Sequence, residues 1–149
     1  MASKKQQHCE RTKCPVACAL DIVGDKWTLL IIRDLMFFNR HEYKELLAAE
    51  EGISTNILSD RLNRLLGYEL IDVIPHPEYG TRKLYYLTQS GKDLVHTLTH
   101  LVRWSSKHLD DLIYIPEEKL TLLRNNPEKM IELTLNELNK WEKEYGIEV

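Results

Sequence analysis

The chain has 149 residues, of which 43% are hydrophobic, and this length and composition are typical of one folded domain. The longest apolar run, TLLIIRDLMFF, is interrupted by Arg33 and Asp34 and is too short to span a membrane. The first residues lack the apolar segment of a secretion signal. Three cysteines are an odd number, which argues against a disulfide framework. We therefore expect a cytoplasmic protein without membrane contact.

The formal net charge of -3 argues by itself against a nucleic-acid partner. The charge is unevenly distributed, however. Residues 1–109 hold 15 Lys+Arg and 13 Asp+Glu, whereas residues 110–149 hold 5 and 10. The first segment can therefore approach phosphates, and the acidic last segment would avoid them.

Four short helices are expected before any strand. Residues 1–13 show no periodic pattern and are expected to form a flexible arm. A helix is predicted over 15–23, and a second one, apolar on nearly all sides, over 26–38. A short amphipathic helix follows over 42–50, with Tyr43, Leu46 and Leu47 facing inward, and Gly52 ends it.

The stretch GISTNILSDRLNRLLGYEL, residues 52–70, predicts a capped helix with a leucine seam. Ser54 is a favourable N-cap residue. Leucines recur on one side at helical spacing, at positions 58, 62 and 65. At ~100° per residue, the side opposite the leucines carries a polar row made of Asn56, Asp60 and Asn63. Ser59 and Arg64 lie beside this row, and Arg61 lies nearer the leucine seam. This row faces either water or a second surface, such as the groove of a nucleic acid.

The second half of the chain predicts a hairpin and further helices. Two β-rich runs flank a turn around residues 77–80. A long helix is expected from Ser90, with one apolar stripe at Leu94, Leu98, Leu101, Ser105 and Leu109. One or two helices follow Pro116, the last over 127–145. Trp104 and Trp141 are expected to pack against neighbouring helices.

The expected fold class is mainly α, a winged helix-turn-helix with a small β-hairpin wing and extra C-terminal helices. In such folds the second helix of the motif enters the major groove of DNA. We expect base-edge contacts from one set of residues, namely Thr55, Asn56, Ser59 and Asn63. We expect phosphate or groove contacts from a second, namely Arg61, Arg64, Arg82 and Lys83. The expected parts of the chain are an arm over 1–13, a DNA-binding domain over 14–109 and an acidic helical extension over 110–149.

Four motifs occur in order: CPV at residue 14, G-x-KWT-x-L-I from residue 24, GIS-x-x-x-LS-x-RL-x-x-L from residue 52, and R-x-x-Y-x-LT-x-x-G from residue 82. Together they resemble the HxlR-type winged-helix regulators, relatives of the MarR group. The resemblance covers residues 14–109 and says nothing about residues 110–149. It implies a homodimeric, DNA-binding transcriptional regulator that binds a pseudo-palindromic operator.

The resemblance also implies roles for particular segments. Residues 54–66 would be the recognition helix and residues 71–88 the wing, with Ser54, Arg61 and Arg82 among the DNA contacts. The first helix and the long helix would form the dimer contact. One departure is Asp25, which stands where these regulators usually carry a glycine.

The cysteines Cys9, Cys14 and Cys18 allow three interpretations. If Pro15 begins the first helix, Cys14 is the N-cap, and the helix dipole together with Lys13 favours its reactive thiolate form. Several members of the resembled family sense oxidants or electrophiles through a cysteine at this position. Alternatively, the three cysteines and His8 hold a metal, although their spacing is not a standard zinc motif. In the third interpretation the cysteines only pack.

The sequence does not predict an enzyme, a cofactor or a bound metal. It contains no glycine-rich phosphate loop, nucleophile elbow or HExxH motif. Two alternatives to an oxidant-responsive DNA-binding regulator stay open. One is a winged-helix regulator controlled by a small-molecule ligand near the C-terminal helices, and the other is a winged helix that binds protein instead of DNA.

Overall fold

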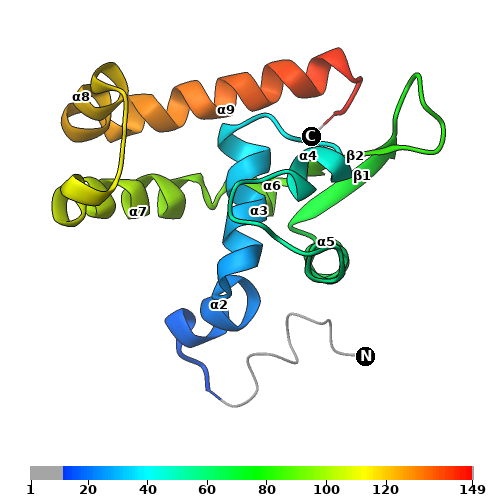
Figure 1. Ribbon diagram of the computed structural model, residues 1–149, viewed down its shortest axis with the longest axis horizontal. Helices are drawn as coiled ribbons and strands as arrows, with labels where there is room; N and C mark the ends of the chain where they lie inside the picture. The colour runs from blue at the N-terminus through cyan, green and yellow to red at the C-terminus, as the bar shows by residue number, and fades with distance from the viewer. Residues whose placement is uncertain (1–11, 149) are drawn as a thin grey trace. The chain divides into compact units, whose positions relative to one another are not determined.

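Helix α3 (Lys26–Phe37) carries the main buried face of the first part of the chain. The computed structural model describes residues 12–148 (Figure 1). Helix α2 (Pro15–Val23) precedes α3, and Asp25 begins α3 because its Oδ1 accepts hydrogen bonds from the backbone N–H groups of Trp27 (2.8 Å) and Thr28 (3.4 Å). Ile32 and Leu35 are fully buried on α3, which packs against α5 and β2.

Helix α4 (Tyr43–Leu47) is shorter than the predicted span of 42–50. After Leu47 the backbone tightens into i+3 hydrogen bonds, from Ala49 N to Leu46 O (3.4 Å) and from Gly52 N to Ala49 O (3.1 Å). Gly52 has a φ of 74°, which other residues rarely adopt, and it turns the chain into α5. The early end of α4 is therefore a turn that the amphipathic pattern did not reveal.

Helix α5 (Thr55–Gly67) begins at Ser54, whose Oγ accepts from the backbone N–H of Ile57 at 3.2 Å. The predicted N-cap is confirmed. Leu58, Leu62 and Leu65 have exposed fractions of 0%, 2% and 1%, which confirms the predicted seam. Helices α4 and α5, joined by the turn at Gly52, form the helix-turn-helix.

The predicted hairpin consists of β1 (Ile71–Pro75) and β2 (Lys83–Leu87), paired antiparallel from Ile71 with Leu87 to Pro75 with Lys83. Arg82 N donates to Tyr79 O at 2.8 Å and closes the turn. The other edge of β2 pairs with the segment before α4, because Tyr85 N donates to His41 O at 2.9 Å and Glu42 forms a bridge with Leu84. The start of α4 is therefore fixed directly beside the wing.

The C-terminal unit, residues 92–149, is described by itself because the chain divides into two compact units after Gly91. The short helix α6 (Gln89–Lys92) leads into it. Helices α7 (Val95–His108), α8 (Glu117–Asn125) and α9 (Pro127–Glu144) pack against one another, with the one-turn helix η1 (Asp110–Leu112) after α7 (Figure 1). The buried ion pair between Lys92 Nζ and Glu142 Oε2, at 2.7 Å, connects the start of this unit to the end of α9.

The prediction for the long helix is wrong in two respects. The helix is divided into α6 and α7, and its buried side chains are Val95, Leu98, Thr99 and Ser106. Leu101 and Trp104 are 49% and 55% exposed, whereas both were expected to pack. Helix α7 has two adjacent apolar faces, and helical spacing alone does not distinguish the face that is buried from the face that is not. Trp141, at 9% exposure, does pack as expected.

The predicted fold class, a mainly α winged helix-turn-helix with a hairpin wing and extra C-terminal helices, is confirmed by this order of elements. The predicted boundaries at residues 14 and 109 stay a prediction. Within residues 12–148, no helix has both the length and the apolar character needed to cross a lipid bilayer.

Candidate nucleic-acid interface

Helix α5 presents one polar face to solvent. Thr55, Asn56, Ser59 and Asn63, the residues predicted for base-edge contacts, are all exposed. Asn56 and Asn63 lie opposite the buried leucines 58, 62 and 65, with Ser59 beside them, and Thr55 lies in the first turn of the helix. Since hydroxyl and amide side chains hydrogen-bond base edges, this face has the chemistry needed to read a DNA groove.

Tyr43 of α4 fixes the first turn of α5. Its hydroxyl donates to the backbone oxygen of Thr55 at 3.2 Å and lies 3.0 Å from Ser59 Oγ. Because a tyrosine hydroxyl has one proton, Ser59 is then the donor in the second bond. Tyr43 was predicted to face inward but is only half-buried. The amphipathic pattern gave no signal for this bond, because it identifies an apolar ring and not the position of its hydroxyl.

Arg61 is already paired within the fold. Its Nε lies 2.8 Å from Asp25 Oδ2, and its Nη1 also pairs with Asp60. Burial alone would raise the pKa of Asp25, but hydrogen bonds from Thr28 and Trp27, together with the positive charge of Arg61, lower that pKa below its usual value. Arg61 therefore joins α5 to the start of α3, a role that the sequence did not indicate. Arg64, by contrast, lies half-exposed further along α5.

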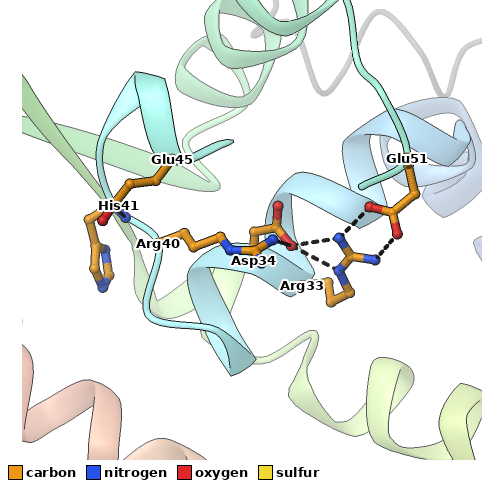
Figure 2. A network of polar contacts seen from close by, with 6 residues as sticks. All are labelled: Arg33, Asp34, Arg40, His41, Glu45 and Glu51. Carbon is orange, nitrogen blue, oxygen red and sulfur yellow. Dashed lines mark hydrogen bonds and ion pairs between the residues drawn. The ribbon is translucent and has the colours of Figure 1, made fainter. Parts of the chain in front are cut away.

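A second arginine, Arg33, anchors the turn that precedes α5 (Figure 2). Its Nη1 and Nη2 each lie 2.8 Å from a carboxylate oxygen of Glu51, and its Nη2 also pairs with Asp34 at 2.7 Å. Arg40 Nη1 approaches Asp34 at 3.4 Å from the other side. Bidentate pairs of this kind fix an orientation as well as a distance. The network therefore sets the position of the turn from which α5 begins.

His41 connects the segment before α4 to the wing. Its Nδ1 lies 2.8 Å from Tyr85 O, and since a carbonyl only accepts, Nδ1 carries the proton. Glu45 Oε2 accepts from the backbone N–H groups of His41 and Glu42, each at 2.9 Å. Burial lowers the pKa of His41 below its usual value, although the hydrogen bond to Tyr85 and the charge of Glu45 act in the opposite direction.

The wing carries exposed basic side chains. Arg82 and Lys83, predicted for phosphate contacts, are both exposed, and they follow the turn between the strands. The Arg82 guanidinium lies over the ring of Tyr79, 4.4 Å from its centroid. It also lies 3.7 Å from Glu42 at the start of α4. Glu42 was not identified from the sequence, because its proximity to the wing depends on the pairing of β2 with the segment before α4.

Cys14 lies at the position predicted for it, as the exposed N-cap of α2, with Pro15 as the first helical residue. Its backbone N–H donates to Thr12 Oγ1 at 3.2 Å. Cys18 is half-buried on α2, and its thiol donates to Thr12 O at 3.4 Å. His8 and Cys9, which the metal interpretation requires, lie outside the described residues. Within residues 12–148, no three His, Cys, Asp or Glu side chains are grouped as metal ligands.

A helix-turn-helix followed by a hairpin wing defines the class of winged helix-turn-helix proteins. Comparison with known proteins identifies the family within this class. The profile of the HxlR-like helix-turn-helix family matches residues 22–112. The chain therefore belongs to the HxlR-like helix-turn-helix family. The match includes α3, α4, α5 and the hairpin.

Individual relatives agree with this assignment. The HTH-type transcriptional regulator Rv3095 of Mycobacterium tuberculosis is 37% identical over 94 residues, which are 63% of this chain and 58% of that relative. The chain thus spans less than two thirds of that relative's length. The crystal structure of PA1607 aligns with a TM-score of 0.60 and 32% identity over 74% of this chain and 72% of that one. A MarR-family protein from Porphyromonas gingivalis W83 aligns with a TM-score of 0.53 and 34% identity over 62% and 90%.

Proposed function

We propose that this protein is a sequence-specific, DNA-binding transcriptional regulator that acts in the cytoplasm. The observation that carries the proposal is the exposed polar face of α5, whose opposite face is buried and whose start is fixed by Ser54 and Tyr43. A rigid helix that presents amides and hydroxyls can read the major groove. The names of its relatives, which include HTH-type transcriptional regulators, support this function over catalysis.

The proposed contacts divide into two groups. Thr55, Asn56, Ser59 and Asn63 contact base edges, and Ser54, Arg64, Arg82 and Lys83 contact phosphates or the groove wall. Arg61 has a different role in this proposal from the one expected, because its guanidinium is held by Asp25 and Asp60. It acts chiefly by positioning α5 and contacts DNA only through the nitrogen that these carboxylates leave available.

We also propose that the protein acts as a homodimer on a pseudo-palindromic operator. Exposed apolar side chains on α2, Val16 and Leu20, and on α7, Leu101 and Trp104, support such an association, because large apolar side chains at a surface are typical of contact sites. Two recognition helices would then enter successive major grooves ~34 Å apart.

The proposed effector is an oxidant or electrophile that reacts with Cys14. The exposure of the Cys14 thiol at the start of α2 supports this interpretation, because an oxidant or electrophile in solution can reach it. Oxidation would join Cys14 to a cysteine of the partner subunit in a disulfide, with two electrons passing to the oxidant and two protons to solvent.

A small-molecule effector near the C-terminal helices is the alternative. An open hollow lies on α8 and is lined by Glu117, Glu118, Thr121, Leu122 and Asn125. Because this hollow is wide open to solvent, it would bury little of a ligand's surface, whereas binding sites for small molecules are typically concave and enclose most of the ligand.

The experiment that tests DNA binding is selection of duplexes from a random pool, followed by titration of the enriched duplex against salt. A regulator of the proposed kind enriches a palindromic motif, and its affinity falls steeply with salt because phosphate contacts release counterions. A winged helix that binds protein would enrich no motif. In that case the polar face of α5 would have a protein partner.

A further inference from the structure

A carboxylate lies among three basic side chains where α4 meets the wing. Glu42 Oε2 is 3.7 Å from Arg82 Nη1 and 3.7 Å from Lys44 Nζ, and Glu42 Oε1 is 4.0 Å from His76 Nε2. The Glu42 side chain is 17% exposed, whereas those of Arg82 and Lys44 are 44% and 62% exposed. The carboxylate is thus the inner group, and the two cations reach solvent beyond it.

The ion pairs of Glu42 are loose. All three separations exceed hydrogen-bond distance, in contrast to the 2.8 Å contacts between Arg33 and Glu51. Glu42 therefore attracts Arg82 and Lys44 by charge without fixing their geometry. Such pairs between partly exposed, flexible side chains are weak and are readily exchanged for another anion.

The hydrogen bonds of the wing determine the charge balance of this cluster. His76 Nδ1 accepts from the backbone N–H groups of Glu78 (3.1 Å) and Tyr79 (3.3 Å), so Nδ1 is unprotonated and the ring is neutral in this arrangement. Arg82 and Lys44 are then the two cations of the cluster, and both lie 3.7 Å from Glu42. Glu45 adds a second carboxylate close by, since its Oε2 accepts from the backbone N–H of Glu42 at 2.9 Å. Asp72, on β1, is exposed and has no ion pair with the cluster among those of the described residues. Arg82 and Lys44 are therefore the groups of this cluster that an external anion can reach from solvent.

We propose that Glu42 pairs with Arg82 and Lys44 in the free protein, in place of a DNA phosphate. On DNA binding, Arg82 and Lys44 leave Glu42 and pair with a phosphate of the DNA backbone. This inference rests on the proposed DNA binding and adds two residues to it, Lys44 as a phosphate contact and Glu42 as an internal competitor. Because phosphate contacts carry no base information, Glu42 lowers affinity for all sequences alike. It thereby limits retention of the protein on non-specific DNA.

The substitution Glu42→Gln tests the competition. Glutamine keeps the side-chain oxygen with which Glu42 takes part in the capping box at the start of α4, and it removes only the charge. We expect affinity for both selected and random duplexes to rise about fivefold at moderate salt. The plot of log affinity against log salt should steepen by about one unit, because one more cation is available to displace counterions.

Two further variants distinguish this mechanism from a general effect of the protein's net charge on DNA binding. Glu137→Gln makes the same charge change at an exposed position of α9, and we expect unchanged binding. In the Arg82→Ala background, Glu42→Gln should give only about half of its gain, because Arg82 and Lys44 lie equally close to Glu42, at 3.7 Å, and one of these two cations is then absent. A gain of full size in that background would contradict the proposal.

Lys44→Ala provides a test that does not depend on Glu42→Gln folding normally, since Lys44 is exposed on α4. It should weaken binding to every duplex and flatten the salt slope by about one unit. If the unaltered protein binds duplex DNA while Glu42→Gln fails to tighten binding or Lys44→Ala leaves the slope unchanged, this inference is wrong and the proposed function stands. If the unaltered protein binds no duplex at low salt, the proposed function fails and the inference fails with it.

Discussion

Arg61 and Asp25 are 36 positions apart in the sequence, and the Nε of the first lies 2.8 Å from Oδ2 of the second. Asp25 is also the N-cap of α3, so one carboxylate both begins the most buried helix and holds the helix proposed to read DNA. An arginine that sequence alone assigns to DNA contacts therefore has an internal partner. Its effect on DNA binding is expected to act largely through the orientation of α5.

Replacement of Asp25 should separate its two roles. Asp25→Ala removes the cap of α3 and the pair with Arg61, and should lower the free energy of unfolding by about 1–2 kcal/mol. Asp25→Asn keeps an oxygen for the cap and loses only the charge, so its cost should be below about 1 kcal/mol. Urea denaturation followed by circular dichroism measures both. Equal losses for the two variants would show that capping is not the larger contribution.

Glu51 should contribute to stability in a defined pH range. The hydrogen bonds from Arg33 lower the pKa of Glu51 to about 2 from 4.5. A lowered carboxyl pKa gives stability that is fully present above pH 4.5 and is lost as pH falls toward 2. Glu51→Gln should therefore lower stability at pH 7 by about 1 kcal/mol or less, since the pair is partly exposed, and should flatten the loss between pH 4.5 and 2. The neighbouring substitution Glu50→Gln is the control, and a similar flattening there would contradict the assignment.

Asn56 and Arg82 should affect DNA binding in different ways. Asn56→Ala is expected to relax the preference at one base pair and to cost about 1–3 kcal/mol on the selected duplex only. Arg82→Ala should weaken binding to all duplexes and flatten the salt slope by about one unit. Anisotropy titrations of selected and scrambled duplexes measure both effects. A uniform loss for Asn56→Ala would mean that its side chain does not contact a base edge.

The buried pair of Lys92 and Glu142 should make a large contribution when only one partner is removed. Their side chains are 4% and 6% exposed and 2.7 Å apart. Lys92→Met leaves a buried carboxylate without its main partner and should destabilise the C-terminal unit by about 3–5 kcal/mol. The double variant Lys92→Met/Glu142→Leu should recover most of this loss. Hydrogen exchange of the α9 amides measures both, and a double variant no more stable than the single one would contradict the argument.

Cys14→Ser should abolish any response of DNA binding to a mild oxidant such as hydrogen peroxide, while leaving binding by the reduced protein unchanged. Cys18→Ser is the matched control, because Cys18 lies one helical turn further along α2 and is half-buried. Non-reducing electrophoresis would show whether a disulfide joins two chains. An oxidant response that persists in Cys14→Ser would assign sensing to another group.

The main helices could be predicted because their signals are local. Ser54, the leucines at 58, 62 and 65, and the hairpin turn around residues 77–80 identify themselves by type and spacing, and the structure has each of them. The length of α4 and the buried face of α7 were predicted wrongly. In both cases the outcome depends on packing partners, which a helical period does not contain.

The ion pairs of the candidate site could not be predicted for a related reason. Arg33 and Asp34 appeared only as interruptions of an apolar run, and Glu42 only as the start of a short helix. Their partners lie far along the chain, at Glu51 for Arg33 and at Arg82 for Glu42. Which charges meet depends on how α3, α4 and the hairpin are arranged, and one sequence gives residue types without that arrangement.

The measurement that tests the proposed interface most directly is an NMR titration of the ¹⁵N-labelled protein with the selected duplex. We predict saturable shifts of the amide signals of residues 54–64 and of Arg82 and Lys83, with smaller changes at α8 and α9. Loss of these shifts at high salt would accompany release of the DNA. Shifts confined to other elements, or none at low salt, would contradict the proposal that α5 and the wing bind DNA.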